Sequence, residues 1–360
     1  MKVVITAGGT GGHIFPALAL IDKLKEKDKD VEILYIGTTD RMEKDIIPNA
    51  GIPYVGIEMK GLNRKHIFKN IDVMKTYFKA CKKAKNELVK FRPDIVIGFG
   101  GYISAPVIYA ASKLKIKTII HEQNSIPGVS NKFLSRYVDK VLVSFKESIK
   151  DFPADKTVYT GNPRSEQVKD IKKLSKTNLG FKKNIPLAII VMGSLGSLTM
   201  TKKLKEVLPL FKNKNYQILL ITGKNYYEEY KDIKVSENVK IVPFLDNLIG
   251  YMKDADLIVT RSGASTIAEI TSIGLPAIMV PSPYVTNNHQ YINAKSLEND
   301  GACIILTEEE FDKESLVNLL DKTFKDKDKL ASMSKALLKR KVDNSSTRIY
   351  EEIIKLVRDE

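Results

Sequence analysis

Two short apolar segments each run directly into a glycine-rich turn and then into a helical pattern. Val4–Thr6 precedes Gly8–Gly12, and Ile190–Met192 precedes Gly193–Gly196. A strand, a glycine turn and a helix in this order open the doubly wound α/β fold. The chain has 360 residues, which is more than one hydrophobic core usually serves. We therefore expect two doubly wound domains, each beginning with one of these units.

Short apolar runs alternate with longer amphipathic segments, as in parallel sheets built from βαβ units. The predicted strands are Val3–Thr6, Ile33–Ile36, Ile95–Gly98, Thr118–Ile120, Val141–Ser144, Leu187–Met192, Ile218–Thr222, Lys240–Val242, Leu257–Thr260 and Ala277–Val280. Gly161, Asn162 and Pro163 end a further strand around Val158. We predict an N-terminal domain over 1–163 and a C-terminal domain over 164–340. Residues 341–360 carry apolar residues at helical spacing and should form a closing helix that packs back toward the N-terminal domain.

Composition narrows the class of protein. Hydrophobic residues make up 43% and charged residues 28%, which is typical of a folded chain rather than a disordered one. Two cysteines, Cys81 and Cys303, cannot form a disulfide framework, which indicates reduced, intracellular thiols. The sequence shows neither a signal peptide nor a membrane span, so we expect a protein of the cytosol or of the cytosolic face of a membrane. The net charge of +15 indicates an anionic partner.

The first glycine loop leads directly into His13. Four glycines let a ligand approach the backbone, and the start of the next helix presents N–H groups to anions. A dinucleotide site is one alternative, but the G-x-G-x-x-G spacing fails at Ile14 and no acidic residue ends the next strand. A tight turn without a ligand is another. His13 favours a ligand site, because open α/β sheets bind ligands at the carboxyl ends of their strands.

A polar run, His121–Asn124, follows the strand Thr118–Ile120 and precedes a turn at Ile126–Gly128. Four consecutive polar groups at the carboxyl end of a strand indicate the wall of a site. Capping of a turn or helix by Asn124 is the alternative interpretation.

In the second half, Arg261–Glu269 follows the strand Leu257–Thr260. Ser262 is the predicted N-cap, and the small residues after it form a seat for phosphate at the helix start. Thr266 and Glu269 share one helix face, where a carboxylate can accept both hydroxyls of a ribose. A capped surface helix with a solvated Glu269 is the alternative.

A loop rich in amide side chains follows at Asn287–Gln290, and amides suit sugar hydroxyls because they both donate and accept. The four histidines show no helical ligand spacing and no nucleophile elbow is present, so we expect no metal. The pair Asp254 and Asp256 is interpreted as structural.

The positive charge is concentrated. Residues 1–163 hold 27 basic and 17 acidic residues, and residues 60–90 alone hold 10 basic and 2 acidic ones. Ile67, Ile71, Met74 and Phe78 repeat there at helical spacing. One interpretation is an ordinary helix whose apolar stripe faces the core. The other is a basic amphipathic surface on anionic lipid, which we favour over nucleic acid because no nucleic-acid motif is present.

Taken in order, these motifs resemble the MurG family of bacterial cell-wall glycosyltransferases. The matching stretches are Gly8–Pro16, Gly98–Pro106 (GFGGYISAP), His121–Gly128 (HEQNSIPG), Gly161–Pro163, Arg261–Glu269 (RSGASTIAE), and His289 and Gln290 with Asn293 and Ala294. They lie in the family's order over nearly the whole chain. The glycine–histidine block, HEQN and RSGAST-AE are specific in combination.

The resemblance implies a GT-B fold, in which two Rossmann-like domains face each other across a cleft. It implies inverting, metal-independent transfer of GlcNAc from UDP-GlcNAc to the C4 hydroxyl of undecaprenyl-diphospho-MurNAc-pentapeptide, which converts lipid I to lipid II in peptidoglycan synthesis. The C-terminal domain would hold the nucleotide sugar, and the N-terminal domain would receive the lipid. No cofactor and no nucleic acid are implied. The expected location is peripheral, on the cytoplasmic side of the cell membrane.

The resemblance also implies roles for single residues. His13 would be the general base, with His121 and Glu122 lining the acceptor side. The substrate contacts would be Thr10, Gly11, Gly12 and Asn124 on the donor sugar and diphosphate side, Arg164 as a candidate for the diphosphate, Ser194 in the second glycine turn, Leu245 over the uracil, Ala264, Ser265 and Thr266 on the phosphates, Glu269 on the ribose and Gln290 on the sugar hydroxyls.

Two positions depart from the family pattern. The second glycine turn commonly reads Gly-Gly-Ser-Gln-Gly-Ala, whereas Leu195 stands here in place of the glutamine. Arg164 follows Pro163 directly, whereas the family often has its arginine one residue later. Two other functions stay open: a GT-B transferase for another lipid or a natural product, and a membrane-associated scaffold with a degenerate sugar-nucleotide site.

Overall fold

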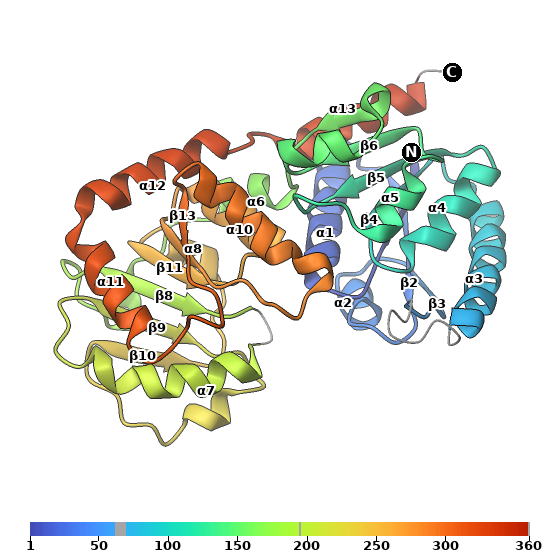
Figure 1. Ribbon diagram of the computed structural model, residues 1–360. Coiled ribbons are helices and arrows are strands. Elements are labelled where there is room, and N and C mark those ends of the chain that lie inside the picture. The colour runs from blue at the N-terminus through green and yellow to red at the C-terminus, as the bar shows by residue number, and fades with distance from the viewer. Residues whose placement is uncertain (62–69, 194–195, 359–360) are drawn as a thin grey trace. The chain divides into compact units, whose positions relative to one another are not determined.

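The computed structural model describes residues 1–61, 70–193 and 196–358, and the chain forms two compact units (Figure 1). The first unit combines Met1–Glu166 with Val342–Glu360, and the second spans Gln167–Lys341. Each unit contains one sheet, of seven and six strands respectively, and every strand pair described is parallel. The predicted α/β class with two Rossmann-like domains is therefore confirmed.

The first sheet has the order β3-β2-β1-β4-β5-β6-β7. Its strands are β1 Lys2–Ala7, β2 Glu32–Thr38, β3 Tyr54–Ile57, β4 Ile95–Gly100, β5 Lys117–Glu122, β6 Lys140–Val143 and β7 Thr157–Tyr159. Its helices are α1 Gly11–Lys27, α2 Glu43–Asn49, α3 Asn70–Phe91, α4 Ser104–Lys113, α5 Val129–Leu134, α6 Arg164–Asp170, which runs on into the second unit, and α13 Ser345–Arg358. Helices lie on both faces of this sheet, because alternate residues of its strands are buried in two separate cores.

One core joins β1 and its neighbours to α1 and α13, and the other joins them to α3 and α4. The C-terminal helix α13 belongs to this first unit although the whole second unit precedes it in sequence. Its Ile349 and Ile353 are fully buried in the core on the α1 side. Figure 1 shows α13 in red beside the blue α1.

The second sheet has the order β10-β9-β8-β11-β12-β13. Its strands are β8 Leu187–Val191, β9 Gln217–Ile221, β10 Val239–Val242, β11 Leu257–Thr260, β12 Ala277–Met279 and β13 Cys303–Ile305. Its helices are α7 Leu198–Val207, α8 Leu248–Met252, α9 Ala264–Ile273, α10 His289–Asn299, α11 Ser315–Lys325 and α12 Lys327–Arg340. Both units also contain short 3₁₀ turns, at Lys146–Asp151, Ala154–Lys156, Lys176–Leu179, Leu208–Phe211, Tyr227–Tyr230 and Thr286–Asn288.

All ten strands predicted by range overlap observed strands, and β7 lies where a strand around Val158 was expected. The strands β3 and β13 were not predicted. Each lies at the edge of its sheet and is short, with 4 and 3 residues. β3 has one buried residue in four, so its sequence gives no apolar run that stands out. β13 lies in the apolar run Ala302–Leu306, which the prediction missed.

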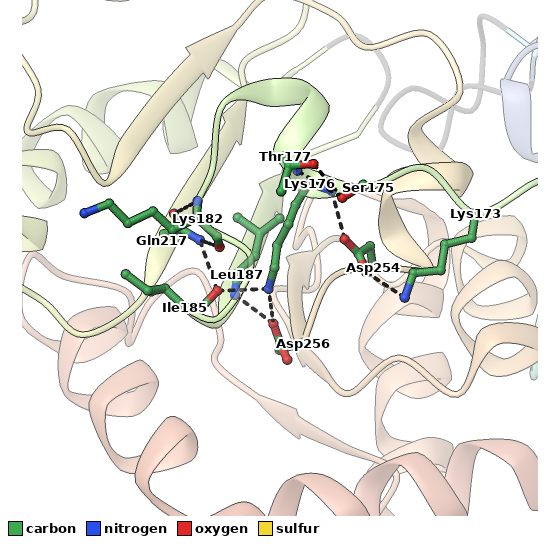
Figure 2. Close-up of polar contacts among 10 residues, drawn as sticks. All are labelled: Lys173, Ser175, Lys176, Thr177, Lys182, Ile185, Leu187, Gln217, Asp254 and Asp256. Atoms are coloured by element: carbon green, nitrogen blue, oxygen red, sulfur yellow. Dashed lines mark hydrogen bonds and ion pairs between the residues drawn. The ribbon is translucent and has the colours of Figure 1, made fainter.

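A cluster of charged and polar contacts fixes the segment that enters the second sheet (Figure 2). The Lys176 ammonium is bonded to the Ile185 carbonyl at 2.9 Å and to Asp256 at 3.2 Å, and Asp256 also accepts from the Leu187 amide at 2.8 Å. Asp254 accepts from the Lys176 amide at 2.8 Å and pairs with Lys173 at 2.6 Å. Asp256 thus ties this segment to the start of β8, and Asp254 ties it to the turn before β11, which confirms the interpretation of both as structural.

Candidate active site

The carboxyl ends of β1 and β4, which are neighbours at the centre of the first sheet, bring two glycine loops together. The Gly8 amide donates to the Gly100 carbonyl at 3.3 Å. A Cβ atom on Gly101 would lie 2.3 Å from the Gly8 carbonyl oxygen, and Gly101 has a φ of +83°. Only glycine therefore fits at this contact. The strand order reverses between β1 and β4, which is where open α/β sheets bind ligands.

His13 lies in the first turn of α1, above this contact. Its Nδ1 atom is 3.1 Å from the Gly8 carbonyl oxygen and 3.4 Å from the Thr10 hydroxyl. Because a carbonyl only accepts, Nδ1 is assigned as the protonated nitrogen, and Nε2 carries the lone pair of the neutral ring. The ring also lies over Gly100, where a Cβ atom would approach Nε2 to 3.1 Å.

The other residues predicted at this loop lie near His13. Thr10 and Gly12 are exposed and Gly11 is half-buried. The side chain of Phe15 packs over Gly11, and the Arg164 guanidinium lies 6.0 Å from the centre of the Phe15 ring. Arg164 therefore belongs to the same edge of the first unit as the start of α1.

His121 is fully buried at the end of β5, so its ring is part of the interior. Its Nε2 atom donates to the Gly161 carbonyl at 3.0 Å, and its Nδ1 atom accepts from the Gln123 amide at 3.0 Å. Burial lowers the pKa of His121 to about 4, although the bond to Gly161 opposes this shift. These contacts tie the end of β5 to the turn at Gly161, which leads to Arg164.

Glu122 is 2% exposed, and its carboxylate is surrounded by the loop that follows it. One oxygen accepts from the backbone and side-chain nitrogens of Asn124 at 3.0 and 3.1 Å. The other accepts from the Gly128 amide and the Asn131 side chain, both at 2.9 Å. These four donors come from the loop that carries the half-buried Asn124, so the carboxylate of Glu122 connects several parts of that loop.

In the second unit, α9 begins after β11, at the corresponding reversal of strand order. The predicted N-cap is wrong: Gly263 occupies that position, and the Ser262 hydroxyl donates instead to the Gln290 carbonyl at 2.7 Å. Ala264 is buried, and Thr266 and Glu269 are half-buried one turn apart. The Ser265 hydroxyl is buried with no hydrogen-bond partner among the residues described. An unsatisfied hydroxyl in the first turn of a helix suits an anion at this end.

The amide-rich loop is attached to the start of α9. The Gln290 side chain accepts from the Ser282 amide at 2.9 Å, and the Asn293 side chain donates to the Ser262 carbonyl at 3.2 Å. Leu245 is half-buried just after β10, beside the 47% exposed Phe244. Ser194 and Leu195 lie outside the described residues.

Sequence patterns did not identify two buried acidic residues, Glu43 and Glu308, that contact the glycine loops or the end of β11. Glu43, which is fully buried, accepts a hydrogen bond from the Gly9 amide. Glu308 pairs with Arg261 at 2.7 Å, and Arg261 also donates to the Ser197 hydroxyl at 3.0 Å, which links the end of β11 to the second glycine turn. The contacts of Glu43 with Gly9 and of Glu308 with Arg261 join residues far apart along the chain, so the local sequence does not mark them.

Comparisons with known proteins identify the family of the chain. Residues 3–143 match the glycosyltransferase family 28 N-terminal domain, and residues 187–349 match the glycosyltransferase family 28 C-terminal domain. A relative from Bacillus pumilus (strain SAFR-032) is 46% identical over 355 residues, covering 97% of this chain and 98% of its own length. A relative from Bacillus subtilis (strain 168) is 42% identical over 361 residues, covering 99% of both chains.

Both relatives are named UDP-N-acetylglucosamine–N-acetylmuramyl-(pentapeptide) pyrophosphoryl-undecaprenol N-acetylglucosamine transferase. Among solved structures, the MurG protein of Acinetobacter baumannii has a TM-score of 0.80 and 27% identity, covering 98% of this chain and 99% of its own. With both domains matched and the similarity extending over the whole length, the chain belongs to the MurG family of glycosyltransferases, within glycosyltransferase family 28.

Proposed function

We propose that this enzyme transfers GlcNAc from UDP-GlcNAc to the C4 hydroxyl of undecaprenyl-diphospho-MurNAc-pentapeptide, with inversion at the anomeric carbon. The observation that carries this proposal is the 46% identity, over 97% of the chain, to a relative named for this transfer. The transfer is the step of peptidoglycan synthesis that converts lipid I to lipid II.

In this proposal His13 is the general base. The acceptor O4–H gives its proton to His13 Nε2 while the O4–C1 bond forms and the bond between C1 and the UDP oxygen breaks. The contact of Nδ1 with the Gly8 carbonyl at 3.1 Å supports this role, because it leaves the lone pair on Nε2. Asn124, Thr10 and Gly12 would contact the transferred sugar from the first unit.

UDP leaves with negative charge, and the start of α9 would stabilise it. Ala264, Ser265 and Thr266 form the first turn of this 10-residue helix, whose N-terminal dipole and N–H groups favour an anion. Glu269 would accept the ribose hydroxyls, and Gln290 would bind hydroxyls of the sugar.

Transfer assays with a short-chain lipid acceptor test the proposal. His13→Gln should lower kcat about 100-fold or more with donor binding retained, since a positioned base contributes 10²–10⁴-fold. Glu269→Ala should raise the donor KM about 10- to 100-fold, as expected for the loss of charge-assisted hydrogen bonds to two hydroxyls. Wild-type activity in His13→Gln would remove the base assignment, and an unchanged donor KM would remove the ribose role of Glu269.

Two outcomes would favour the other functions. Donor hydrolysis or transfer to a different lipid or natural product, without transfer to the MurNAc acceptor, would indicate another GT-B transferase. Binding of UDP-GlcNAc without any transfer would indicate a degenerate scaffold. The presence of His13, Asn124 and Glu269 favours the enzyme.

We further propose that the first unit binds an anionic membrane surface through α3 and α5. Met74, Phe78 and Val89 of α3 are 46%, 64% and 55% exposed, and Phe133 of α5 is 42% exposed. The interpretation that Met74 and Phe78 face the core is wrong, because Val73, Ala80, Ala84 and Leu88 form the buried face of α3 instead. Ile67 lies outside the described residues, as does the side chain of Ile71.

Charge and aromatic groups surround these exposed side chains. Lys75, Lys82 and Lys85 are exposed on the same side of α3 as Phe78. Lys113 of α4 lies over the rings of Tyr109 and Tyr137, at 5.3 and 5.9 Å from their centres. Aromatic rings beside basic residues suit the headgroup region of a bilayer. Among the helices described, none combines the length and apolar character needed to cross a membrane.

Co-sedimentation with vesicles tests the membrane proposal. Each basic residue near an anionic surface contributes about 1 kcal/mol, so replacing Lys75, Lys82 and Lys85 by Glu should lower binding to vesicles rich in phosphatidylglycerol about 100-fold or more. The matched control replaces three exposed lysines of α12, Lys329, Lys335 and Lys339, by Glu. Equal losses in both triple variants, or binding that salt leaves unchanged, would refute a specific electrostatic surface. Lys83 is left intact because it bonds to the Gly56 carbonyl at 2.7 Å.

A further inference from the structure

A buried carboxylate lies beneath the glycine loop that carries His13. Glu43, the first residue of α2, is fully buried. One of its oxygens accepts from the Gly9 amide at 3.1 Å. The other accepts from the Thr38 amide at 3.1 Å and the Thr38 hydroxyl at 2.7 Å. These three donors are uncharged, so among the described residues it is the backbone and a hydroxyl that stabilise this carboxylate.

The loop is built around this side chain. A Cβ atom on Gly8 would lie 2.5 Å from a Glu43 oxygen, and a Cβ atom on Gly37 would lie 2.8 Å from the Glu43 Cγ atom. Two glycines therefore make room for Glu43. Because the Gly9 N–H points at Glu43, this part of the loop serves the protein's own carboxylate and is not a donor for a ligand phosphate.

The same peptide group connects Glu43 to His13. The N–H of Gly9 and the C=O of Gly8 belong to one planar unit and point in opposite directions. Glu43 accepts from the N–H on one side, at 3.1 Å, and His13 Nδ1 donates to the C=O on the other, also at 3.1 Å. A carboxylate that accepts from the N–H polarises the peptide and makes its carbonyl a stronger acceptor.

We propose that Glu43 is a positioning residue that acts on His13 through the Gly8–Gly9 peptide group. It holds the peptide in the orientation that keeps the proton on His13 Nδ1 and the lone pair on Nε2. It also stabilises the imidazolium that forms when Nε2 takes the acceptor proton. This is the part that an aspartate plays in a catalytic triad, here with one peptide group between the carboxylate and the imidazole. The catalytic half of the proposal rests on the proposed function, and the tautomer does not.

Glu43→Gln is the decisive variant. Its single amide oxygen can satisfy either Thr38 or Gly9, and the two Thr38 donors favour the former. The NH₂ group then faces the Gly9 N–H, so the peptide loses its acceptor and the polarisation of Gly8 C=O is lost. We expect kcat to fall about 10- to 100-fold with the donor KM unchanged, because a mispositioned base loses part of its contribution.

The matched control is Thr38→Val. It removes the hydroxyl donor but leaves the carboxylate and its bond to Gly9 in place. We expect kcat within about 3-fold of wild type in this variant, even where its melting temperature falls as much as that of Glu43→Gln. A purely structural role for Glu43 predicts the opposite pattern, in which kcat stays unchanged in both folded variants.

A second readout needs no substrate. Imidazole ¹⁵N shifts of the wild-type enzyme, with His13 assigned by difference from His13→Gln, should show the Nδ1–H tautomer, and the Gly9 amide should exchange slowly with solvent. In Glu43→Gln the His13 signal should move toward a mixture of tautomers. An Nε2–H tautomer in the wild type, or an unaltered tautomer and kcat in Glu43→Gln, would overturn the proposal.

These readouts also separate this proposal from the proposed function. Glu43→Gln could lose the Nδ1–H tautomer of His13 while the wild type shows no transfer. That result would support the action of Glu43 on His13 and reject the transfer function. Where Glu43→Gln does not fold, the wild-type tautomer and the Gly9 exchange rate decide.

Discussion

The loop that presents Asn124 should depend on the ionised carboxylate of Glu122. Glu122→Gln keeps the size of the side chain but replaces one acceptor oxygen by an NH₂ donor. In the structure both oxygens accept two hydrogen bonds each, all between 2.9 and 3.1 Å, and the residue is 2% exposed. Whichever way the amide turns, two donors of the loop then face another donor.

The magnitude follows from those two lost contacts. Hydrogen bonds to a charged group contribute about 1.5–3 kcal/mol each, so their loss should cost about 3–6 kcal/mol before the loop relaxes. A relaxed loop should retain a loss of about 3 kcal/mol. For a unit of this size, 1 kcal/mol corresponds to about 2–4 °C, so the melting temperature of the first unit should fall by roughly 6–12 °C.

Calorimetry and transfer kinetics measure the two consequences of Glu122→Gln. The calorimetric transition of the first unit should shift, and kcat should fall because Asn124 loses its support. Binding of UDP to the second unit should persist. The matched control is Glu58→Gln, the same change at an exposed glutamate, which should alter stability by less than about 0.5 kcal/mol. If Glu122→Gln were as stable as Glu58→Gln, the four-donor account of this loop would be wrong.

Three further outcomes are expected. Folding lowers the pKa of His121 from 6.5 to about 4, so the unfolded state binds the proton first as the pH falls. The free energy of unfolding should therefore fall by up to about 3 kcal/mol between about pH 6.5 and about pH 4. In pH-dependent unfolding, His121→Gln should lack this component. Asp256→Asn leaves the 8% exposed side chain of Lys176 without its ion pair, and it should destabilise the second unit by about 1–3 kcal/mol in urea unfolding. Asp254→Asn should cost less than about 1 kcal/mol, because the lysine that pairs with Asp254 is exposed. Gly101→Ala should cost roughly 2 kcal/mol or more and lower transfer while UDP binding is kept, and a wild-type thermal midpoint would contradict the contact with the Gly8 loop.

Local patterns in the sequence predicted most of the fold. The central strands, such as β1 and β8, are runs of buried aliphatic residues, and such runs stand out between amphipathic segments. The glycine turns that follow them mark the carboxyl ends of strands, so the positions of His13 and Arg261–Glu269 at the sheet edges followed as well. The edge strand β3 was missed because it is short and partly exposed, and β13 was missed although it lies in the apolar run Ala302–Leu306.

Local sequence patterns could not predict which of the site residues are buried and which are exposed. The motif HEQN predicted polar groups at a site wall, but the structure buries His121 and Glu122 and leaves Asn124 half-buried. The apolar repeat of α3 fitted a core-facing stripe, yet Phe78 is 64% exposed while the small residues Ala80 and Ala84 pack on the sheet. Periodicity identifies a helix face, but only the neighbouring elements determine which face is covered.

The sequence by itself determined two parallel α/β domains, the placement of the glycine turns and of His13 at the carboxyl ends of strands, and the family to which the chain is similar. These properties depend on neighbours within a few residues and on the right-handed crossover between parallel strands. Only the tertiary structure decided how the chemical groups are oriented. The contact of Glu43 with Gly9 joins residues 34 positions apart, and that of His121 with Gly161 joins residues 40 apart. A proton's place on a particular histidine nitrogen depends on such partners, because a hydrogen bond is set by distance and direction in space and not by separation along the chain.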